Sequence, residues 1–490
     1  MRIGTLHRAA VATIGFGIIS AVLCCGNSAA GATNAASDSP RVDPATLARV
    51  RDAAMGSSWA WEHLVKLSDG VGPRLSGSPQ LTAAVTEVAN AMRSLGADVM
   101  QQAVKVPHWV RGKEQAELIQ YPGNAAGITQ ELRLTTLGGS SATPAAGLTA
   151  RVIVVHDFDE LKAREAEIHG NVVLFESRFD QRLADNGYAL DAYERAAAYR
   201  VKGPSAAQAL GAAAALVRSI GGANFRLPHA GVTKWKNGQA PIPCAALAAE
   251  DADMIERLAA AGAVTLKLLL TPQTLADAES NNVIADWPGR EKTGEYVVVS
   301  GHLDSWDLAT GATDDGVGVV GAAAVIEVLR QLDLHPRRTI RFVAWTNEEN
   351  GGRGSKAYFE SVNGKIDTQI AAIESDAGAG RSLGVAAAVT KESLELLQPV
   401  LESLRPIGAT VLVRKDDELG ADIALLQKAG VPGFAPLVDL RHYFDYHHTA
   451  ADTVDKVDPE NLKTQVATMA VLAYYLAELP ERLPSFKVSP

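Results

Sequence analysis

Histidine and carboxylate side chains occur at five places where they could bind metal ions. These places are His302, Asp314, the pair Glu348 and Glu349, Asp376, and the loop 446–452 with its two histidines. Such ligands suit Zn²⁺, with Co²⁺ or Mn²⁺ as alternatives. One zinc ion takes about three protein ligands and leaves one position for water. Five ligands with one shared carboxylate therefore match two ions about 3.5–4 Å apart, which could hold a hydroxide nucleophile and polarise a carbonyl group.

The adjacent glutamates Glu348 and Glu349 could divide two tasks between them. Neighbouring side chains diverge from a regular strand, so both cannot bind the same ion from one. In a turn, one glutamate can bind metal while the other faces the water and acts as a general base. A solvated acidic turn is the alternative that this dipeptide alone does not exclude.

The elements that must position these side chains are strands followed by loops and helices. Residues 295–300 are apolar and β-branched, which predicts a buried strand, and residues 316–332 have the apolar spacing of a helix. Further strands are predicted at 338–346, 370–375, 410–414 and 433–437, and a closing helix at 458–479. This alternation predicts an α/β fold, with a mostly parallel mixed sheet and helices on both faces. Ligands bind beyond the carboxyl ends of such strands, so residues distant in sequence can converge there.

The first half of the chain contains helices and then a second α/β unit. Asp43 has the character of an N-cap before Pro44, with helices expected through Leu67 and from 80 to 95. Short β-type runs follow at 130–136, 150–156, 171–175 and 264–270, and Ala-rich helices at 205–221 and 249–261.

Residues 123–277 are interpreted as an inserted domain. The reason is that residues 281–301 resume a strand character that the first helices alone could not cover. The catalytic domain would then comprise residues 43–122 and 278–490.

Residues 1–32 have the pattern of a secretory signal. Arg2 and Arg8 precede the apolar run 9–25, and small residues offer a cleavage site near Ala30 and Ala32. The apolar run is marginally short for a membrane-spanning helix. We expect export to a secreted or periplasmic location without stable membrane insertion after cleavage; an uncleaved anchor is the alternative. Residues 33–42 are a polar spacer.

Composition excludes other classes of function. The net charge of −10, without a basic cluster, argues against binding of nucleic acid or anionic membranes. After removal of the signal, Cys244 is the one remaining cysteine, so no internal disulfide is expected. Its apolar neighbours predict a buried thiol rather than a nucleophile.

Five motifs in order carry a family resemblance. They are GHLDS at 301–305, GATDDGVG at 311–318, WTNEENGG at 345–352, ESD at 374–376 and HHTAADT at 447–453. The chain resembles the co-catalytic dizinc exopeptidases of family M28, which include aminopeptidases and glutamate carboxypeptidases, and most of all their plasma glutamate carboxypeptidase branch. The resemblance covers the catalytic domain and residues 72–79. It implies the zinc-exopeptidase, phosphorylase/hydrolase-like fold, and residues 123–277 resemble a protease-associated domain that would shape the substrate cleft.

The resemblance also implies two Zn²⁺ per chain and a role for each ligand. Asp314 would be the carboxylate that bridges both ions. His302 and Asp376 would complete one zinc site. Glu349 and His448 would complete the other.

The same resemblance implies the residues that assist the reaction. Glu348 would act as general base, taking the proton from the zinc-bridged water that attacks the carbonyl and passing it to the leaving amine. Asp304 would orient His302, and Asp315 would follow a cis peptide bond. His447 stands where relatives carry an oxyanion-stabilising Tyr, so it is either a donor to the developing oxyanion or a packing residue.

One departure from the family bears on specificity. Many aminopeptidase relatives carry Ser-Asp-His in the loop before the last ligand, but here Asp422 is followed by Ile423. This favours the carboxypeptidase branch and makes Asp422 a candidate for the substrate pocket. Arg414, Lys415 and Arg441 are candidates for binding a substrate carboxylate, with surface solvation as the alternative for each.

The sequence therefore predicts an exported dizinc metallo-exopeptidase that hydrolyses dipeptides or short peptides. An aminopeptidase with the same chemistry is the first alternative. A non-catalytic binding ectodomain on a peptidase fold is the second, although such a protein would be expected to have lost ligands. Members of the family form dimers, which makes a second copy of the chain a candidate partner.

Overall fold

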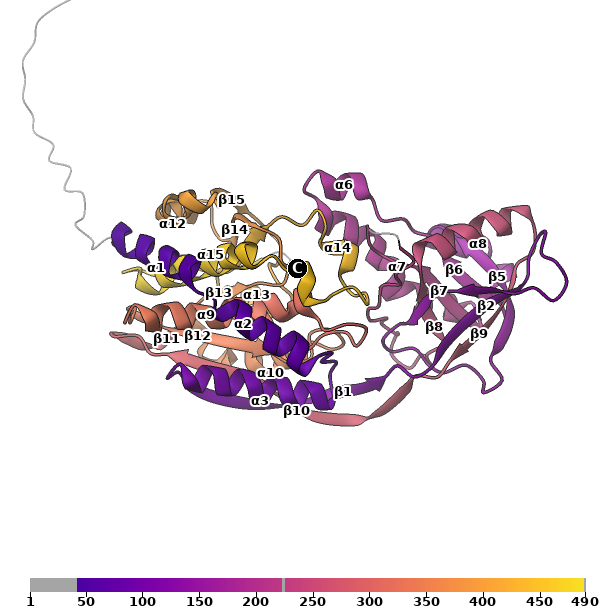
Figure 1. Ribbon diagram of the computed structural model, residues 1–490, viewed down its shortest axis with the longest axis horizontal. Coiled ribbons are helices and arrows are strands. Elements are labelled where there is room, and N and C mark those ends of the chain that lie inside the picture. Colours follow the sequence, from indigo (N-terminus) through magenta and orange to yellow (C-terminus); the bar gives the residue numbers. More distant parts are fainter. Residues whose placement is uncertain (1–41, 223–224, 489–490) are drawn as a thin grey trace, which may run out of the picture. The chain divides into compact units, whose positions relative to one another are not determined.

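The computed structural model describes residues 42–222 and 225–488 (Figure 1). The predicted signal, residues 1–32, lies outside the described residues, as does all but the last residue of the spacer. Within the described ranges the strands form two eight-stranded mixed sheets. In the same part of the chain, no helix is both long and apolar enough to cross a membrane.

The first sheet has parallel strands at its centre. In spatial order its strands are β1 (Asp98–Val110), β10 (Gln273–Trp287), β12 (Arg338–Trp345), β11 (Lys292–His302), β13 (Gln369–Glu374), β16 (Gly433–Val438), β14 (Ser382–Ala388) and β15 (Val411–Arg414). The neighbours β12, β11, β13 and β16 run parallel to one another. Strands β1 and β10 pair antiparallel on one side, and β14 is antiparallel to β16 on the other. The predicted α/β fold with a mixed sheet is confirmed.

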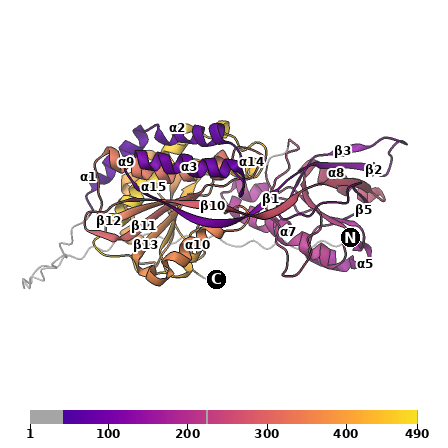
Figure 2. The same cartoon turned by 90° about the horizontal axis from the view of Figure 1, so that it is seen from below.

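Helices cover both faces of this sheet, as Figure 2 shows for α2, α3 and α9 on one side and α10 on the other. The first layer consists of α1 (Pro44–Gly56), α2 (Trp59–Val65), α3 (Pro79–Ser94), α9 (Val317–Gln331) and α15 (Pro459–Glu478), and the second includes α10 (Arg353–Val362) and α13 (Ala424–Lys428). Side chains alternate between the two faces of a strand. Accordingly Val297 and Val299 of β11 pack under the first layer, while Val298 packs under the second.

The helix ends follow the predicted capping pattern. The Asp43 carboxylate accepts hydrogen bonds from the backbone N–H groups of Ala45 and Thr46, with Pro44 in the first turn. Asp458 caps α15 in the same way. A side-chain acceptor at this position satisfies backbone donors that have no partner inside the helix.

The second sheet is built from residues 114–270. Its strands, in spatial order, are β3 (Gln130–Leu132), β2 (Glu114–Gln120), β9 (Thr265–Leu270), β5 (Leu148–Val155), β6 (Val172–Phe175), β7 (Ala214–Arg218), β8 (Cys244–Leu247) and β4 (Leu134–Thr136). The helices of this part of the chain are α4 (Phe158–Ala163), α5 (Glu165–Ile168), α6 (Gln181–Asp185), α7 (Ala189–Ala209) and α8 (Ala249–Ala261). Three short helices, α11 (Ser393–Leu396), α12 (Gln398–Leu404) and α14 (Tyr443–Tyr446), lie in the C-terminal part of the chain instead. Because β2 already lies in this sheet, the second sheet begins before residue 123; the division into catalytic and inserted domains stays a prediction.

The helix predicted at 205–221 is wrong in its second half. Helix α7 ends at Ala209, and the buried segment Ala214–Arg218 forms strand β7, parallel to β6 and β8. A strand covered on both faces has a continuous apolar run rather than an alternating one, so an Ala-rich strand that follows an Ala-rich helix has no distinguishing period. The sequence patterns also do not predict strands β1, β2, β8 and β14.

Cys244 lies fully buried at the start of β8, where burial raises the pKa of its thiol to about 12. Because only the thiolate reacts with alkylating agents, we expect iodoacetamide to leave Cys244 unmodified in the folded protein and to modify it in denaturant. Mass spectrometry of the peptide that contains Cys244 measures this. Alkylation in the native state at the rate of a free thiol would contradict the burial.

Candidate metal centre

The five predicted ligands meet at the carboxyl ends of the central parallel strands. His302 is the last residue of β11, Glu349 follows β12 and Asp376 follows β13. Asp314 lies in a tight turn at Ala312–Gly316, directly before α9, and His448 follows α14. Parallel strands bring these segments to the same edge of the sheet, although the residues are far apart in sequence.

The two carboxylate oxygens of Asp314 face two different groups of ligands. Asp314 Oδ1 lies 3.2 Å from His302 Nε2, which lies 3.4 Å from Asp376 Oδ1. Asp314 Oδ2 lies 3.1 Å from His448 Nε2, which lies 3.1 Å from Glu349 Oε2. Ligand atoms bound at about 2.0–2.1 Å to a tetrahedral zinc ion are roughly 3.3–3.4 Å apart. The spacing therefore fits two ions that share Asp314.

The charge of the site also fits bound cations. Besides the ligands Asp314 and Glu349, five more carboxylates are buried in this part of the structure: Asp304, Asp315, Glu374, Asp422 and Asp452. The Oδ2 atom of Asp314 is buried and faces the Nε2 atoms of His448 at 3.1 Å and His447 at 3.3 Å. Because burying unpaired negative charge is costly, this donor set calls for positive charge at its centre.

The pKa values of the ligands reflect the same crowding. Burial by itself lowers the pKa of the His302 imidazole, but the carboxylates of Asp376 and Asp314 raise it well above its ordinary value. Burial and the negative charge of Asp314 raise the pKa of Glu349 to about 7. Metal ions would take the place of these protons, because ligands bind in their deprotonated forms.

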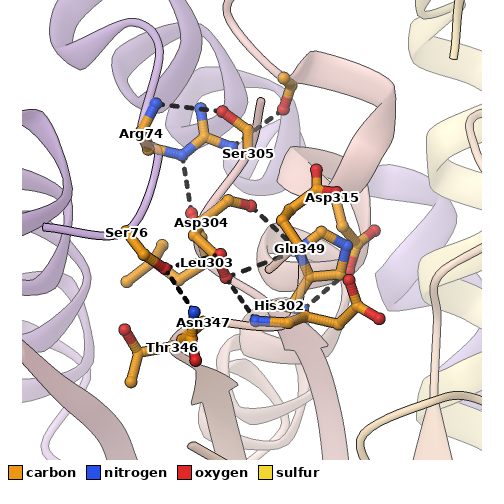
Figure 3. A network of polar contacts seen from close by, with 12 residues as sticks. Arg74, Ser76, His302, Leu303, Asp304, Ser305, Asp315, Thr346, Asn347 and Glu349 are labelled. Carbon is orange, nitrogen blue, oxygen red and sulfur yellow. Dashed lines mark hydrogen bonds and ion pairs between the residues drawn. The ribbon is translucent and has the colours of Figure 1, made fainter. Parts of the chain in front are cut away.

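His302 is oriented by the main chain of Asp304 (Figure 3). Its Nδ1 lies 2.9 Å from the Asp304 carbonyl oxygen, whereas the nearest Asp304 carboxylate oxygen is 4.0 Å away. The carboxylate instead accepts hydrogen bonds from the backbone N–H of Glu348 at 2.9 Å and from Ser76 Oγ at 3.1 Å. The expected side-chain contact with His302 is thus replaced by a main-chain contact, because the chain turns after β11 and points the carbonyl group at the ring.

Arg74 fastens the loop after β11 from the N-terminal part of the chain (Figure 3). Its fully buried guanidinium donates to the carbonyl oxygens of Leu303 at 2.8 Å, Thr310 at 2.5 Å and Gly311 at 2.9 Å. These bonds satisfy carbonyl groups of the loop that lies between His302 and Asp314. The motif at 72–79 therefore supports the metal centre without contacting it.

Asp315 and Asp452 hold the turn that carries Asp314. The Asp314–Asp315 peptide bond is cis, and the Asp315 carboxylate accepts from the backbone N–H of His302 at 3.0 Å. Asp452 accepts from the backbone N–H groups of Thr313 at 2.7 Å and Asp314 at 3.1 Å. Asp452 lies in the last sequence motif, four residues after His448, but the motif alone does not indicate this role.

Ala230, from the part of the chain between β7 and β8, also holds a ligand. Its backbone N–H donates to the His448 carbonyl oxygen at 2.7 Å, and its own carbonyl lies 3.2 Å from His448 Nδ1. A carbonyl acceptor at Nδ1 leaves Nε2 free to bind metal. No sequence pattern indicated this contact, because a main-chain carbonyl group carries no side-chain signature.

A pocket of about 630 Å³ opens over the ligands, and Glu348 and His447 line it with them. Other lining side chains come from α7 and from the loop after β7. Asp422 and Arg441 do not line this pocket. Asp422 is buried beside Glu374, and Arg441 lies on the surface in an ion pair with Asp439.

The other two carboxylate-binding candidates also lie elsewhere. Arg414 donates to the Val389 carbonyl and pairs with Asp416, while Lys415 is exposed. Local contacts therefore account for Arg414, and surface solvation accounts for Lys415.

His447 is enclosed by aromatic rings. It stacks on His448 with ring centroids 3.7 Å apart, and the rings of Tyr193, Tyr443 and Phe444 meet it edge-on. Burial, followed by the charge of His448, lowers the pKa of His447 well below its ordinary value, so the ring is neutral near pH 7. Its Nδ1 atom has no hydrogen-bond partner within the described part of the chain.

Comparison with known proteins places the chain among peptidases. The model of peptidase family M28 matches residues 282–473. Carboxypeptidase Q from Bos taurus and that from Homo sapiens are each 34% identical to this chain over 427 residues. The aligned region covers 87% of this chain and 86% of each relative. The structure of a peptidase M28 precursor from Shewanella amazonensis is 32% identical, with a TM-score of 0.85 over 91% of this chain and 99% of its own. A zinc aminopeptidase from Bacillus subtilis shares the fold, at 18% identity and a TM-score of 0.62 over 88% of this chain and 98% of its own.

Replacing Asp452 by Asn should weaken metal binding. The amide keeps the size of the side chain but replaces one of the two acceptor oxygens by an NH2 group, so either Thr313 or Asp314 loses its acceptor and the turn that carries Asp314 loosens. We expect a loss of about 10–100-fold in zinc affinity, measured by competition with a chelator. Asp455→Asn, at an exposed position three residues further on, is the matched control. Equal affinity of Asp452→Asn and wild type would contradict the role of Asp452.

Proposed function

Because the chain belongs to peptidase family M28 and is a zinc metallopeptidase, we propose that it is a dizinc exopeptidase that hydrolyses dipeptides or short peptides, similar to carboxypeptidase Q. The observation that carries the proposal is the division of Asp314, whose two oxygens face two separate His–carboxylate pairs. One ion alone would leave one of these groups uncompensated. The similarity of the whole chain to carboxypeptidase Q supports the exopeptidase class.

The proposed first site comprises Asp314 Oδ1, His302 and Asp376, and the second comprises Asp314 Oδ2, His448 and Glu349. When bound, the ions would polarise the attacking water and the scissile carbonyl group. The protein contributes the spacing of the ligands and the orientation of both imidazole rings through main-chain carbonyl groups.

Glu348 is proposed as the general base. It lines the pocket beside the ligand Glu349, and its backbone N–H is held by the Asp304 carboxylate. Its carboxylate takes a proton from the attacking water as the new C–O bond forms. It then gives this proton to the amine when the C–N bond breaks, so the same group acts as base and as acid.

His447 is proposed as a donor to the carbonyl oxygen as negative charge develops there. His447 lines the pocket over the ligands and its Nε2 lies 3.3 Å from Asp314 Oδ2, so a neutral imidazole can carry its one N–H group on the side of the metal centre. The aromatic rings around it fix the ring plane, which is the preorganisation that such a donor needs. A purely structural role within this aromatic cluster is the alternative.

Three further expectations stay proposals. Export rests on residues 1–32, and a homodimer rests on the family resemblance alone. The choice between carboxypeptidase and aminopeptidase depends on which end of the peptide the pocket binds.

Glu348→Gln should lower kcat by about 10²–10⁴-fold, because the amide cannot accept the proton. Zinc content should remain near two ions per chain in both the variant and the wild type, measured by elemental analysis after dialysis. Glu360→Gln, an exposed change on α10, is the matched control and should retain full activity.

The outcomes separate the alternatives. Full activity of Glu348→Gln would end the assignment of the base. A wild type that binds no zinc and hydrolyses no peptide would favour a binding ectodomain on a peptidase fold instead. One zinc ion per chain with full activity would contradict the paired site.

His447→Ala should lower kcat by about 10²–10³-fold with little change in KM, because the lost contact acts in the transition state. His447→Gln retains an N–H donor and should restore part of the rate. Steady-state kinetics at constant zinc content measure both variants. An unchanged kcat in His447→Ala would remove the donor role and leave the structural one.

A further inference from the structure

Arg200 differs from every other buried arginine in the described part of the chain. These buried arginines are Arg74, Arg111, Arg200, Arg218 and Arg338. Arg74 donates to four main-chain carbonyl groups. Arg111, Arg218 and Arg338 each form ion pairs with carboxylates. Arg200 has no carboxylate partner among the described residues.

The guanidinium of Arg200 makes two hydrogen bonds. Nη1 donates to the Ala230 carbonyl oxygen at 3.2 Å and Nη2 to Tyr193 Oη at 2.6 Å, while Nε has no partner within the described ranges. The residue is 6% exposed. A guanidinium carries five N–H groups, and a buried charge without a counter-ion is costly. The local structure therefore holds an uncompensated cation.

This cation lies in the wall of the pocket over the metal centre. Arg200 lines the pocket together with His302, Asp376 and the exposed Lys234. Gly231, at φ +142°, packs flat against it, since a Cβ atom there would come within 2.4 Å of Arg200 Cζ. The side chain is thus held in place by backbone on one side and by the Tyr193 hydroxyl on the other.

The charges that line the pocket are segregated. The lining carboxylates are Asp314, Glu348, Glu349 and Asp376, each already placed at the metal ions or as the base. The lining cations are Arg200 and Lys234, both from the segment between β6 and β8. Among the described lining residues no carboxylate is left over for a substrate ammonium group, whereas two cations are left for a substrate anion.

We propose that Arg200, assisted by Lys234, binds the free C-terminal carboxylate of the peptide substrate. A planar guanidinium matches a carboxylate in a two-bond geometry, and a fixed one loses little entropy on binding. Lys234, which is exposed, adds a second positive charge to the lining of the pocket. The inference rests on the proposed peptidase function and assigns it to the carboxypeptidase or dipeptidase class.

Arg200 also touches the support of a metal ligand, which gives a second explanation to test. The Ala230 carbonyl oxygen accepts from Arg200 Nη1 and also faces His448 Nδ1. If Arg200 acted only through Ala230, its loss would slow the hydrolysis of every peptide equally. If Arg200 instead recognises a carboxylate, its loss slows only the hydrolysis of peptides that carry one.

The experiment compares a dipeptide with its own C-terminal amide, using the zinc-loaded full chain. Wild type should have a kcat/KM at least about 100-fold higher for the free acid. Arg200→Met should lower kcat/KM for the acid by about 10–100-fold, as expected for a lost charge-assisted contact, and leave the amide unchanged. Lys234→Met should cause a smaller loss, mainly in KM. Arg195→Met removes an exposed charge from the same helix and should leave kcat/KM unchanged for both substrates.

Each result bears on the proposal. Equal losses on acid and amide, or no loss on either, overturn the role of Arg200. A wild type that cleaves the amide as fast as the acid overturns carboxylate recognition but leaves the peptidase function intact. No cleavage of either substrate by zinc-loaded wild type overturns the proposed function itself. If Arg200→Met fails to fold, as judged by circular dichroism, Lys234→Met decides, since a loss confined to the acid supports the proposal and no loss contradicts it.

Discussion

Negative charge buried at one edge of the first sheet is the constraint that organises this protein. Carboxylates gather there because several parallel strands end together and each is followed by an acidic residue. The buried Arg74 offsets part of this negative charge, but its hydrogen bonds go to carbonyl groups rather than to the carboxylates. Without cations the carboxylates would have to hold protons, as the raised pKa of Glu349 indicates. The edge is stable as a set of anions only when metal ions occupy it.

The support around the ligands links groups that perform different tasks. Asp304 is the clearest example, since its carbonyl group orients a metal ligand while its carboxylate fixes the backbone of the residue proposed as base. Asp452 similarly holds the turn that carries Asp314 through two backbone N–H groups. His302 and the proposed base Glu348 therefore share one rigid frame, which limits how far either can move independently.

Much of the first sheet could be predicted because strand-end ligands have a distinct sequence pattern. An apolar strand followed by glycines and a carboxylate, as around Asp314, is recognisable without a structure. Ala230 and Arg200 were not recognisable, for different reasons. A main-chain carbonyl group leaves no trace in the sequence, and an arginine in an Ala-rich helix has the appearance of a surface residue until its neighbours are known. Strand β7 was missed because its alanines continue the composition of the preceding helix.

The long antiparallel pair β1 and β10 has a consequence for how the chain closes on itself. Asp98 pairs with Asp286 and Val110 with Gln273, so the whole of the second sheet is synthesised between the two partners. The entropy lost on closing a loop grows with the logarithm of its length. Pairing of β2 with β9 brings Glu114 beside Leu270, which leaves only a few residues between the pairs on either strand. Once the second sheet has formed, strands β1 and β10 can therefore pair progressively from Val110 and Gln273 onward, as the strands of a local hairpin do, although they are distant in sequence.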